Sequence, residues 1–398
     1  MSDLDLPLGF RWSGHHSGIK TDVSKPDYAL VASDCDAVCV GVYTQNLVRA
    51  APVLWCQKNS PNSKCRAVVV NSGNANACTG KKGAEDTLAM AEDVARELGL
   101  DATQVMVMST GLIGSNLPME KIGPAASRGV MRLNRERSSF LDAAQAILTT
   151  DQGKKICQRE LQTSQGIIRL AAIAKGAGMI GPDMATMLAC VMTDASLETN
   201  QAQAILKRVA DKSFNCVSVE GHTSTNDTLL LLANGVATED HLNGEDLLLF
   251  ESTLESAMVE LAKQIPADGE GSTHLIEIEV DGASSGDEAK IIAQTVASSN
   301  LVKTCVAGAD PNWGRVVSAV GYAGVALDVR DVSLKINGNL LFENGEPRDF
   351  DEIAVSSSMR DCFDTKIELV VGHGEGHARV WTSDLNCEYV RFNSDYHT

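Results

Sequence analysis

Thr186 is a candidate nucleophile because of the residues that precede it. Residues 175–194 read KGAGMIGPDMATMLACVMTD, so a glycine-rich segment leads to the small Ala185 and then to the hydroxyl of Thr186. A flexible backbone and a small neighbour suit an N-to-O acyl shift, in which the hydroxyl attacks the Ala185 carbonyl carbon and hydrolysis of the ester breaks the chain. The new terminal amino group, with a pKa near about 8, can then accept the hydroxyl proton. The stretch therefore indicates self-cleavage followed by catalysis from Thr186.

Two other interpretations of this stretch stay open on the residues alone. Gly176, Gly178 and Gly181 form a G-x-G-x-x-G pattern, which binds a dinucleotide when it joins a strand to a helix. Pro182 argues against that unit, because it follows the last glycine directly and the run behind it can be strand or helix. The plainer interpretation is a glycine-rich turn between two buried strands, with an ordinary strand threonine after it.

Three more segments carry groups that an acyl transfer needs. Residues 109–114 (STGLIG) place a hydroxyl and backbone N–H groups at a strand end, which suits an oxyanion hole or a plain strand-to-helix connection. Lys175 stands alone among apolar neighbours, where it either faces solvent or holds a substrate carboxylate. Glu270 lies between two glycines, in a turn that is either merely solvated or binds an amino group or shuttles protons.

Two polar clusters have weaker functional interpretations. His373 and His377 have the i, i+4 spacing of zinc ligands, but the glycines beside them predict a hairpin turn and not a metal site. Residues 220–227 (EGHTSTND) form a dense polar loop before a buried strand, and this loop is either turn chemistry or part of a site wall. The sequence therefore predicts a site without a metal.

The composition limits the class of protein. A chain of 398 residues exceeds what one hydrophobic core supports, so two domains are expected. The net charge of −18 argues against nucleic acid or an anionic membrane as a partner, since both are polyanions. Eleven cysteines without a CxxC pair, no secretory signal, and no apolar run of about 20 residues indicate reduced thiols in a cytoplasmic enzyme.

Strands and helices alternate along the chain. Residues 1–25 are polar and contain a loop-like GHHSG (14–18), and runs rich in valine and alanine predict strands at 28–33, 37–44, 51–56 and 66–73. Helical spacing predicts helices at 84–98, 119–133, 138–148, 200–215, 246–264 and 288–297. Further strands are predicted at 104–109, 167–175, 228–236, 275–280, 331–336 and 366–371. The irregular alternation favours a layered α/β or α+β architecture.

Eight segments carry long and chemically unusual motifs. In chain order they are NSGNANACTG (71–80), STGLIGSNLPMEKI (109–122), ILTTD (147–151), KGAGMIGPDMATML (175–188), TSTNDT (223–228), DGEGST (268–273), GADPNWGR (308–315) and YVRFNSDYHT (389–398). Together they resemble the ornithine acetyltransferase family, the glutamate N-acetyltransferases of arginine biosynthesis. The resemblance implies a two-domain α/β fold of stacked sheets flanked by helices. It also implies self-cleavage between Ala185 and Thr186 into an α chain (1–185) and a β chain (186–398).

The resemblance further implies roles for individual residues. Thr186 would carry acetyl from N-acetylornithine to glutamate by a ping-pong route, and Thr110 and Gly111 would form the oxyanion hole. The substrate-binding positions would be Thr149, Lys175, Thr186, Glu270, Asn393 and Thr398. No cofactor is implied, and the sequence leaves open whether acetyl-CoA is a second donor. Assembly of the α and β chains into an α2β2 heterotetramer is expected. The alternative is an amidase or aminopeptidase, in which water takes the acyl group from the same threonine.

Overall fold

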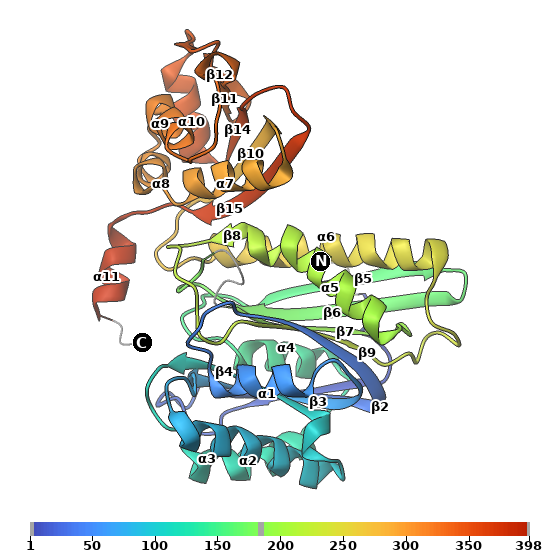
Figure 1. Cartoon of the computed structure of the whole chain (residues 1–398). Coiled ribbons are helices and arrows are strands. Elements are labelled where there is room, and N and C mark those ends of the chain that lie inside the picture. Colours follow the sequence, from blue (N-terminus) through green and yellow to red (C-terminus); the bar gives the residue numbers. More distant parts are fainter. Residues whose placement is uncertain (1–3, 182–186, 396–398) are drawn as a thin grey trace.

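The computed structural model describes residues 4–181 and 187–395, and it shows a layered body with a smaller second part beside it (Figure 1). Each part is built around its own β-sheet. The two-domain, stacked-sheet α/β fold expected from the sequence is therefore confirmed. Within the described residues, no helix is both long and apolar enough to cross a membrane.

The first sheet draws strands from both sides of the expected cleavage position. Its order is β4-β3-β2-β9-β7-β6-β5, and β1 pairs with β2. The strands are β1 (Phe10–His15), β2 (Tyr28–Tyr43), β3 (Asn62–Asn74), β4 (Val105–Leu112), β5 (Lys155–Thr163), β6 (Gly166–Lys175), β7 (Leu188–Thr193) and β9 (Thr228–Ala233). β7 and β9 lie between β6 and β2, so the segments before and after residues 182–186 share one sheet.

β2 is long enough to belong to two layers. Tyr28 to Ala32 pair with β3, whereas Val38 to Tyr43 pair with β9. The register shifts between Ala32 and Ala37, where an irregularity of this kind bends a strand. The sheet therefore folds over at β2 into two stacked layers, one containing β3 and β4 and the other containing β5, β6, β7 and β9.

Apolar side chains fill the space between the two layers. Val68 and Met106 come from the first layer, and Cys190 and Leu230 come from the second. β7 contributes alternate residues to this core and to the core on its other side, so both of its faces are buried. Such a strand reads as a continuous apolar run in the sequence.

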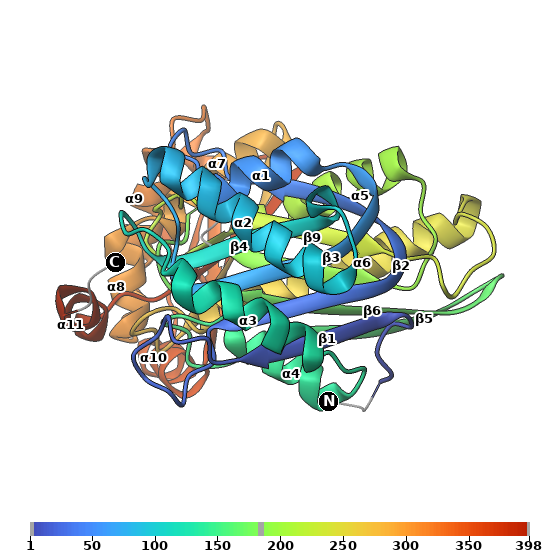
Figure 2. The ribbon, with the colours of Figure 1, turned by 90° about the horizontal axis from the view of Figure 1, so that it is seen from below.

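Helices cover the outer face of each layer. They are α2 (Gly80–Leu98) and α3 (Met119–Met131) on the first layer, and α5 (Thr199–Lys212) and α6 (Gly244–Ala267) on the second. Figure 2 shows α2 and α3 lying across β3 and β4. On α6, the buried Phe250, Leu254 and Met258 recur every four residues and form one apolar face, as the sequence predicts.

The second part is a seven-stranded sheet packed against helices. Its order is β13-β12-β11-β14-β10-β15-β8. The strands are β8 (Val217–Ser218), β10 (Leu275–Ala283), β11 (Ser333–Ile336), β12 (Asn339–Glu343), β13 (Glu346–Pro347), β14 (Asp364–Val370) and β15 (Gly376–Ser383). The helices packed against it are α7 (Gly286–Ala297), α8 (Asn300–Ala307), α9 (Trp313–Gly321) and α10 (Glu352–Asp361). The C-terminal helix α11 (Cys387–Asp395) contributes no buried residue to this core.

Two of the local predictions for residues 1–60 are wrong. Residues 51–56 belong to a helix, α1 (Ala51–Asn59), and not to a strand. Proline in the first turn favours the start of a helix, and the buried face of α1 consists of Pro52, Val53 and Cys56. In so short an apolar run, the spacing of the residues does not distinguish a helix from a strand. The GHHSG segment is not all loop, because Gly14 and His15 belong to β1, which pairs along its whole length with β2. α4 (Arg137–Ala146) matches the helix predicted at 138–148.

Candidate active site

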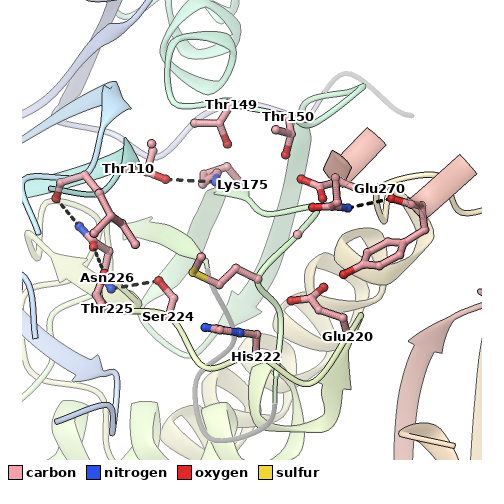
Figure 3. Close-up of a pocket in the computed structure, with 17 residues that line it drawn as sticks. Thr110, Thr149, Thr150, Lys175, Glu220, His222, Ser224, Thr225, Asn226 and Glu270 are labelled. Atoms are coloured by element: carbon pink, nitrogen blue, oxygen red, sulfur yellow. Dashed lines mark hydrogen bonds between the residues drawn. The ribbon is translucent and has the colours of Figure 1, made fainter. Parts of the chain in front are cut away.

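A cavity of about 270 Å³ lies where several connections of the body meet the C-terminal helix α11. It is lined by Ala75, Thr110, Gly111, Ile113, Thr149, Thr150, Lys175, Gly178, Met179, Glu220, His222, Ser224, Thr225, Asn226, Glu270, Tyr389 and Asn393. In Figure 3, Thr110, Thr149 and Lys175 lie on one side of this pocket, and Glu220 and His222 lie on the facing side.

Six of the residues singled out in the sequence meet in this pocket. They are Thr110, Gly111, Thr149, Lys175, Glu270 and Asn393. Ala185, Thr186 and Thr398 lie outside the described residues. The chain reaches the pocket just before residues 182–186, because Gly178 and Met179 line it. Directly after those residues, the N–H of Met187 donates to Asp227 Oδ1 at 3.2 Å, and Leu188 pairs with Lys175 across β7 and β6.

The contact between Lys175 and Thr110 fixes the direction of a hydroxyl proton. Lys175 Nζ lies 3.2 Å from Thr110 Oγ1, and both side chains are buried. An ammonium group only donates, so Thr110 accepts this hydrogen bond and its own O–H must point elsewhere. A hydroxyl donor at the end of β4 is thus available to a ligand in the cavity.

Gly111 occupies a position that other residues cannot adopt. Its φ is +130°, and a Cβ here would lie 2.3 Å from the backbone carbon of Gly73. The close approach brings β4 against the β3 loop at the edge of the pocket. A glycine is therefore required where the sequence places the second half of the expected oxyanion hole.

A buried ion network lies behind Thr149 and Lys175. Asp151 Oδ1 accepts from the Gly176 N–H at 2.6 Å and from Lys155 Nζ at 2.7 Å, and Oδ2 accepts from the Thr149 N–H at 3.0 Å. Lys155 also donates to Asp268 at 2.5 Å. One carboxylate thereby holds the Thr149 turn and the start of the glycine-rich segment.

The charged groups of this network shift one another's pKa values. Burial opposes ionisation of Asp151, but the ammonium groups of Lys175 and Lys155 hold its pKa well below the usual range. Burial lowers the pKa of Lys175, and the Asp151 carboxylate opposes that shift. Asp151 therefore favours the charged form of the buried Lys175, against the effect of burial.

The polar loop of residues 220–227 forms a wall of the site. Asn226 Nδ2 donates to the carbonyls of Ala75 at 2.7 Å and Ser109 at 2.8 Å, which ties the loop to β4 and to the loop after β3. Burial raises the pKa of Asp227 well above its usual value. Of the two sequence interpretations of this loop, the site wall is correct for Glu220, His222 and Ser224–Asn226, since all of them line the cavity.

Glu270 packs directly against Gly178. The Glu270 N–H donates to the Ala177 carbonyl at 2.9 Å, and a Cβ on Gly178 would lie 2.4 Å from the Glu270 carboxylate. We expect Gly178→Ala to displace this carboxylate and to lower kcat/KM by about 100-fold, the scale of loss that follows a misplacement of about 1 Å. Gly321→Ala, with open space around its Cβ, is the matched control and should keep full activity. Full activity of Gly178→Ala would show that the position of Glu270 is irrelevant.

The dinucleotide interpretation does not fit the described part of the glycine segment. The N–H groups of Gly176 and Ile180 donate to side-chain oxygens of Asp151 and Glu220, each at 2.6 Å, so an acceptor of this chain already occupies each donor. A Cβ on Gly181 would lie 2.7 Å from the backbone of Gly221, which shows close chain packing. A strand, β7, follows the segment where the fingerprint requires a helix.

Neither of the paired histidines lines the pocket, and each lies beside a different aspartate. His377 is on β15, where its Nδ1 lies 2.8 Å from Asp281, whereas His373 lies 3.4 Å from Asp331. Strand β10 separates β14 from β15, so the connection is not the hairpin predicted from the glycines.

Sequence reasoning missed several pocket residues. Asp151 follows Thr150 directly and has a lysine four residues later, which is the one local sign of its ion pair. Tyr389 begins the motif at 389–398, but nothing in the sequence predicts a role for it. Ala75 and Met179 are chemically plain, and only the folded chain shows that they line the cavity.

Known proteins match this chain over almost its full length. The ArgJ family model matches residues 11–398. The arginine biosynthesis bifunctional protein ArgJ of Rhodopirellula baltica is 45% identical over 99% of this chain and 96% of its own length. The protein of the same name from Bacillus subtilis is 40% identical over 100% of this chain and 97% of its own. A crystal structure of argJ from Bacillus halodurans is 36% identical with a TM-score of 0.50, and it covers 51% of this chain and 96% of the solved chain.

Proposed function

The chain belongs to the ArgJ family of arginine biosynthesis, and from this membership we propose that it transfers acetyl from N-acetylornithine to glutamate through an ester on Thr186. The observation that carries the proposal is the shared pocket. Six residues from five separate segments, with the chemistry an acyl transfer needs, line one cavity of about 270 Å³. The direct test is whether purified protein, given N-acetylornithine and glutamate, forms ornithine and N-acetylglutamate in equal amounts.

The proposed reaction uses the donors at the end of β4. The Thr186 hydroxyl attacks the acetyl carbonyl and its proton passes to the α-amino group of the same residue. The Thr110 O–H, directed away from Lys175, donates to the developing oxyanion. The proton then reaches the ornithine nitrogen as the C–N bond breaks, leaving acetyl-Thr186. The glutamate amine attacks that ester by the reverse route and regenerates the hydroxyl. Lys175 supplies a positive charge for the α-carboxylate of the substrates, and Glu270 supplies a negative charge for the α-amino group of glutamate.

Self-cleavage at Ala185–Thr186 is part of this proposal. Because 51% of this chain covers 96% of the solved Bacillus halodurans chain, that chain is about half as long as this one. A half-length chain is what cleavage near the middle would leave. β7 lies inside the first sheet, so the α chain (1–185) and the β chain (186–398) would stay joined by β6–β7 and β9–β2 pairing. We also propose an α2β2 assembly.

Thr110→Val tests the oxyanion donor. Valine keeps the shape of the side chain but removes the O–H, so we expect kcat to fall by about 10²–10³-fold, the usual effect of losing one such donor. Steady-state kinetics with N-acetylornithine and glutamate measure it. Thr365→Val is the matched control, because Thr365 is a buried threonine on β14 whose hydroxyl has no partner among the described residues. A Thr110→Val enzyme with unchanged kcat would remove Thr110 from the mechanism.

Acetyl-CoA is a second donor in the proposed function. The relatives' printed names call those proteins bifunctional, which supports two activities on one site. The test supplies acetyl-CoA and glutamate without N-acetylornithine and follows free thiol and N-acetylglutamate. Formation of both supports the second activity, and their absence restricts the enzyme to transfer between amino acids. Partition of acetyl between glutamate and water, in the same assay, separates a transferase from an amidase.

A further inference from the structure

Glu220 is a carboxyl group that the mechanism above does not use. It lines the cavity on the wall that faces Thr110 and Lys175 (Figure 3). Its Oε1 accepts from the Ile180 N–H at 2.6 Å, which anchors the side chain at the cavity wall. The residue is open to the cavity, so a substrate can reach it. Glu220 is therefore placed to meet the end of a substrate that lies away from the oxyanion donors.

The groups around Glu220 do not neutralise it. Glu270, Tyr389 and His222 line the same cavity, and the described residues form no ion pair with Glu220. Lys303 on α8 is the nearby cation, but its ammonium donates to the Val219 carbonyl and, at 3.5 Å, to Ser383 Oγ. Desolvation by the surrounding protein atoms raises the pKa of Glu220 to about 8. Repulsion from the Glu270 carboxylate adds to this shift, and attraction to the Lys303 ammonium opposes it.

The proposed function creates a recognition problem at this wall. N-acetylornithine ends in an ammonium group, and glutamate ends in a carboxylate, yet a ping-pong enzyme binds both in one pocket. A carboxylate attracts the first and repels the second, whereas a carboxylic acid donates a hydrogen bond to the second. A fixed charge at this wall would favour one substrate only.

Resting on the proposed function, we propose that Glu220 recognises the side chains of both substrates. As a carboxylate it binds the ammonium group of the donor, and as a carboxylic acid it donates a hydrogen bond to the carboxylate of the acceptor. Binding of the donor then releases the Glu220 proton to solvent, and binding of the acceptor takes one up. Glu270 is less suited to this exchange, because it is wedged against Gly178 at the edge of the glycine segment. Glu220 is in this sense a specificity-determining residue.

Glu220→Gln tests the assignment, because an amide can still donate to a carboxylate but carries no charge for an ammonium. In a ping-pong reaction, kcat/KM for each substrate reports its own half-reaction. We expect kcat/KM for N-acetylornithine to fall about tenfold or more and kcat/KM for glutamate to change less than about threefold. Unchanged glutamate kinetics also show that the variant is folded. Glu375→Gln, at an exposed glutamate between β14 and β15, is the matched charge control.

A donor without the ammonium group completes the test. With N-acetylnorvaline, wild-type and Glu220→Gln enzymes should have the same kcat/KM, because the charge that Glu220 recognises is absent. Glu220 ionises as the pH rises through about 8, so the wild-type to variant ratio should rise with pH for N-acetylornithine and fall for glutamate.

Equal losses for both substrates, or an equal loss with N-acetylnorvaline, would overturn the assignment of Glu220. A failure of the proposed function looks different, because wild-type enzyme would then transfer no acetyl from N-acetylornithine at all. The two outcomes are therefore distinguishable in one set of assays.

Discussion

Thr186→Ala is expected to leave one uncut chain of 42.3 kDa and to lower acetyl transfer by about 10⁶-fold, to the assay background. The substitution removes the hydroxyl that would both cut the chain and carry the acetyl group, so the two losses should appear together. Denaturing gel electrophoresis reports cleavage, and formation of N-acetylglutamate reports transfer.

Thr186→Ser is the matched control, because serine keeps a hydroxyl and should retain cleavage and transfer at reduced rates. A Thr186→Ala protein that still separates into two chains would show that another group cuts the backbone. A variant that still transfers acetyl would show that the nucleophile lies elsewhere.

Asp151→Asn is expected to lower the free energy of unfolding by about 3–5 kcal/mol at neutral pH. The carboxylate compensates the buried Lys155 and Lys175, and removing one partner of a buried ion network leaves uncompensated charge. Urea denaturation followed by tryptophan fluorescence measures the change, best in the Thr186→Ala background so that one continuous chain unfolds. Asp361→Asn, at an exposed aspartate ending α10, is the control and should change stability little.

The pH dependence of this difference has a definite sign. The folded-state pKa of Asp151 lies below its unfolded value of about 4, so the carboxylate stabilises the fold above that pH. The contribution falls as the pH drops through the folded-state pKa. The wild type should therefore lose stability in acid faster than Asp151→Asn, and the two should converge. A constant difference down to acid pH would show that Asp151 acts by shape and not by charge.

The helices could be predicted from the sequence where apolar side chains recur with clear helical spacing. The α6 stripe and the end of α2, where Gly99 has a φ of +69°, follow from sequence alone. β5 could not be predicted, because polar residues such as Gln158 and Arg159 interrupt its apolar pattern at the sheet edge. The fold of the sheet over β2 depends on a change of pairing partner within one strand, which no local period shows.

Site residues could be predicted where a polar side chain stands in a glycine-rich or apolar stretch of sequence. Thr110, Lys175 and Glu270 were singled out by an isolated polar group beside glycines or apolar runs, and the structure brings them into one pocket. The wall formed by Glu220 and Asn226 depends on the topology, since β9 enters the sheet beside β2 and brings the loop before it against β4. Asp151 was missed because its role depends on Lys175 and Gly176, which are distant in the sequence, as well as on the nearby Lys155.

The central claim is that acetyl passes through an ester on the first residue of a newly made chain. Intact-mass spectrometry of wild-type protein mixed with N-acetylornithine, without glutamate, tests it most directly. We predict two chains, residues 1–185 and 186–398, with the second heavier by one acetyl group, and loss of that group when glutamate is added. One chain of 42.3 kDa, or two chains of which neither gains an acetyl group, would contradict the claim.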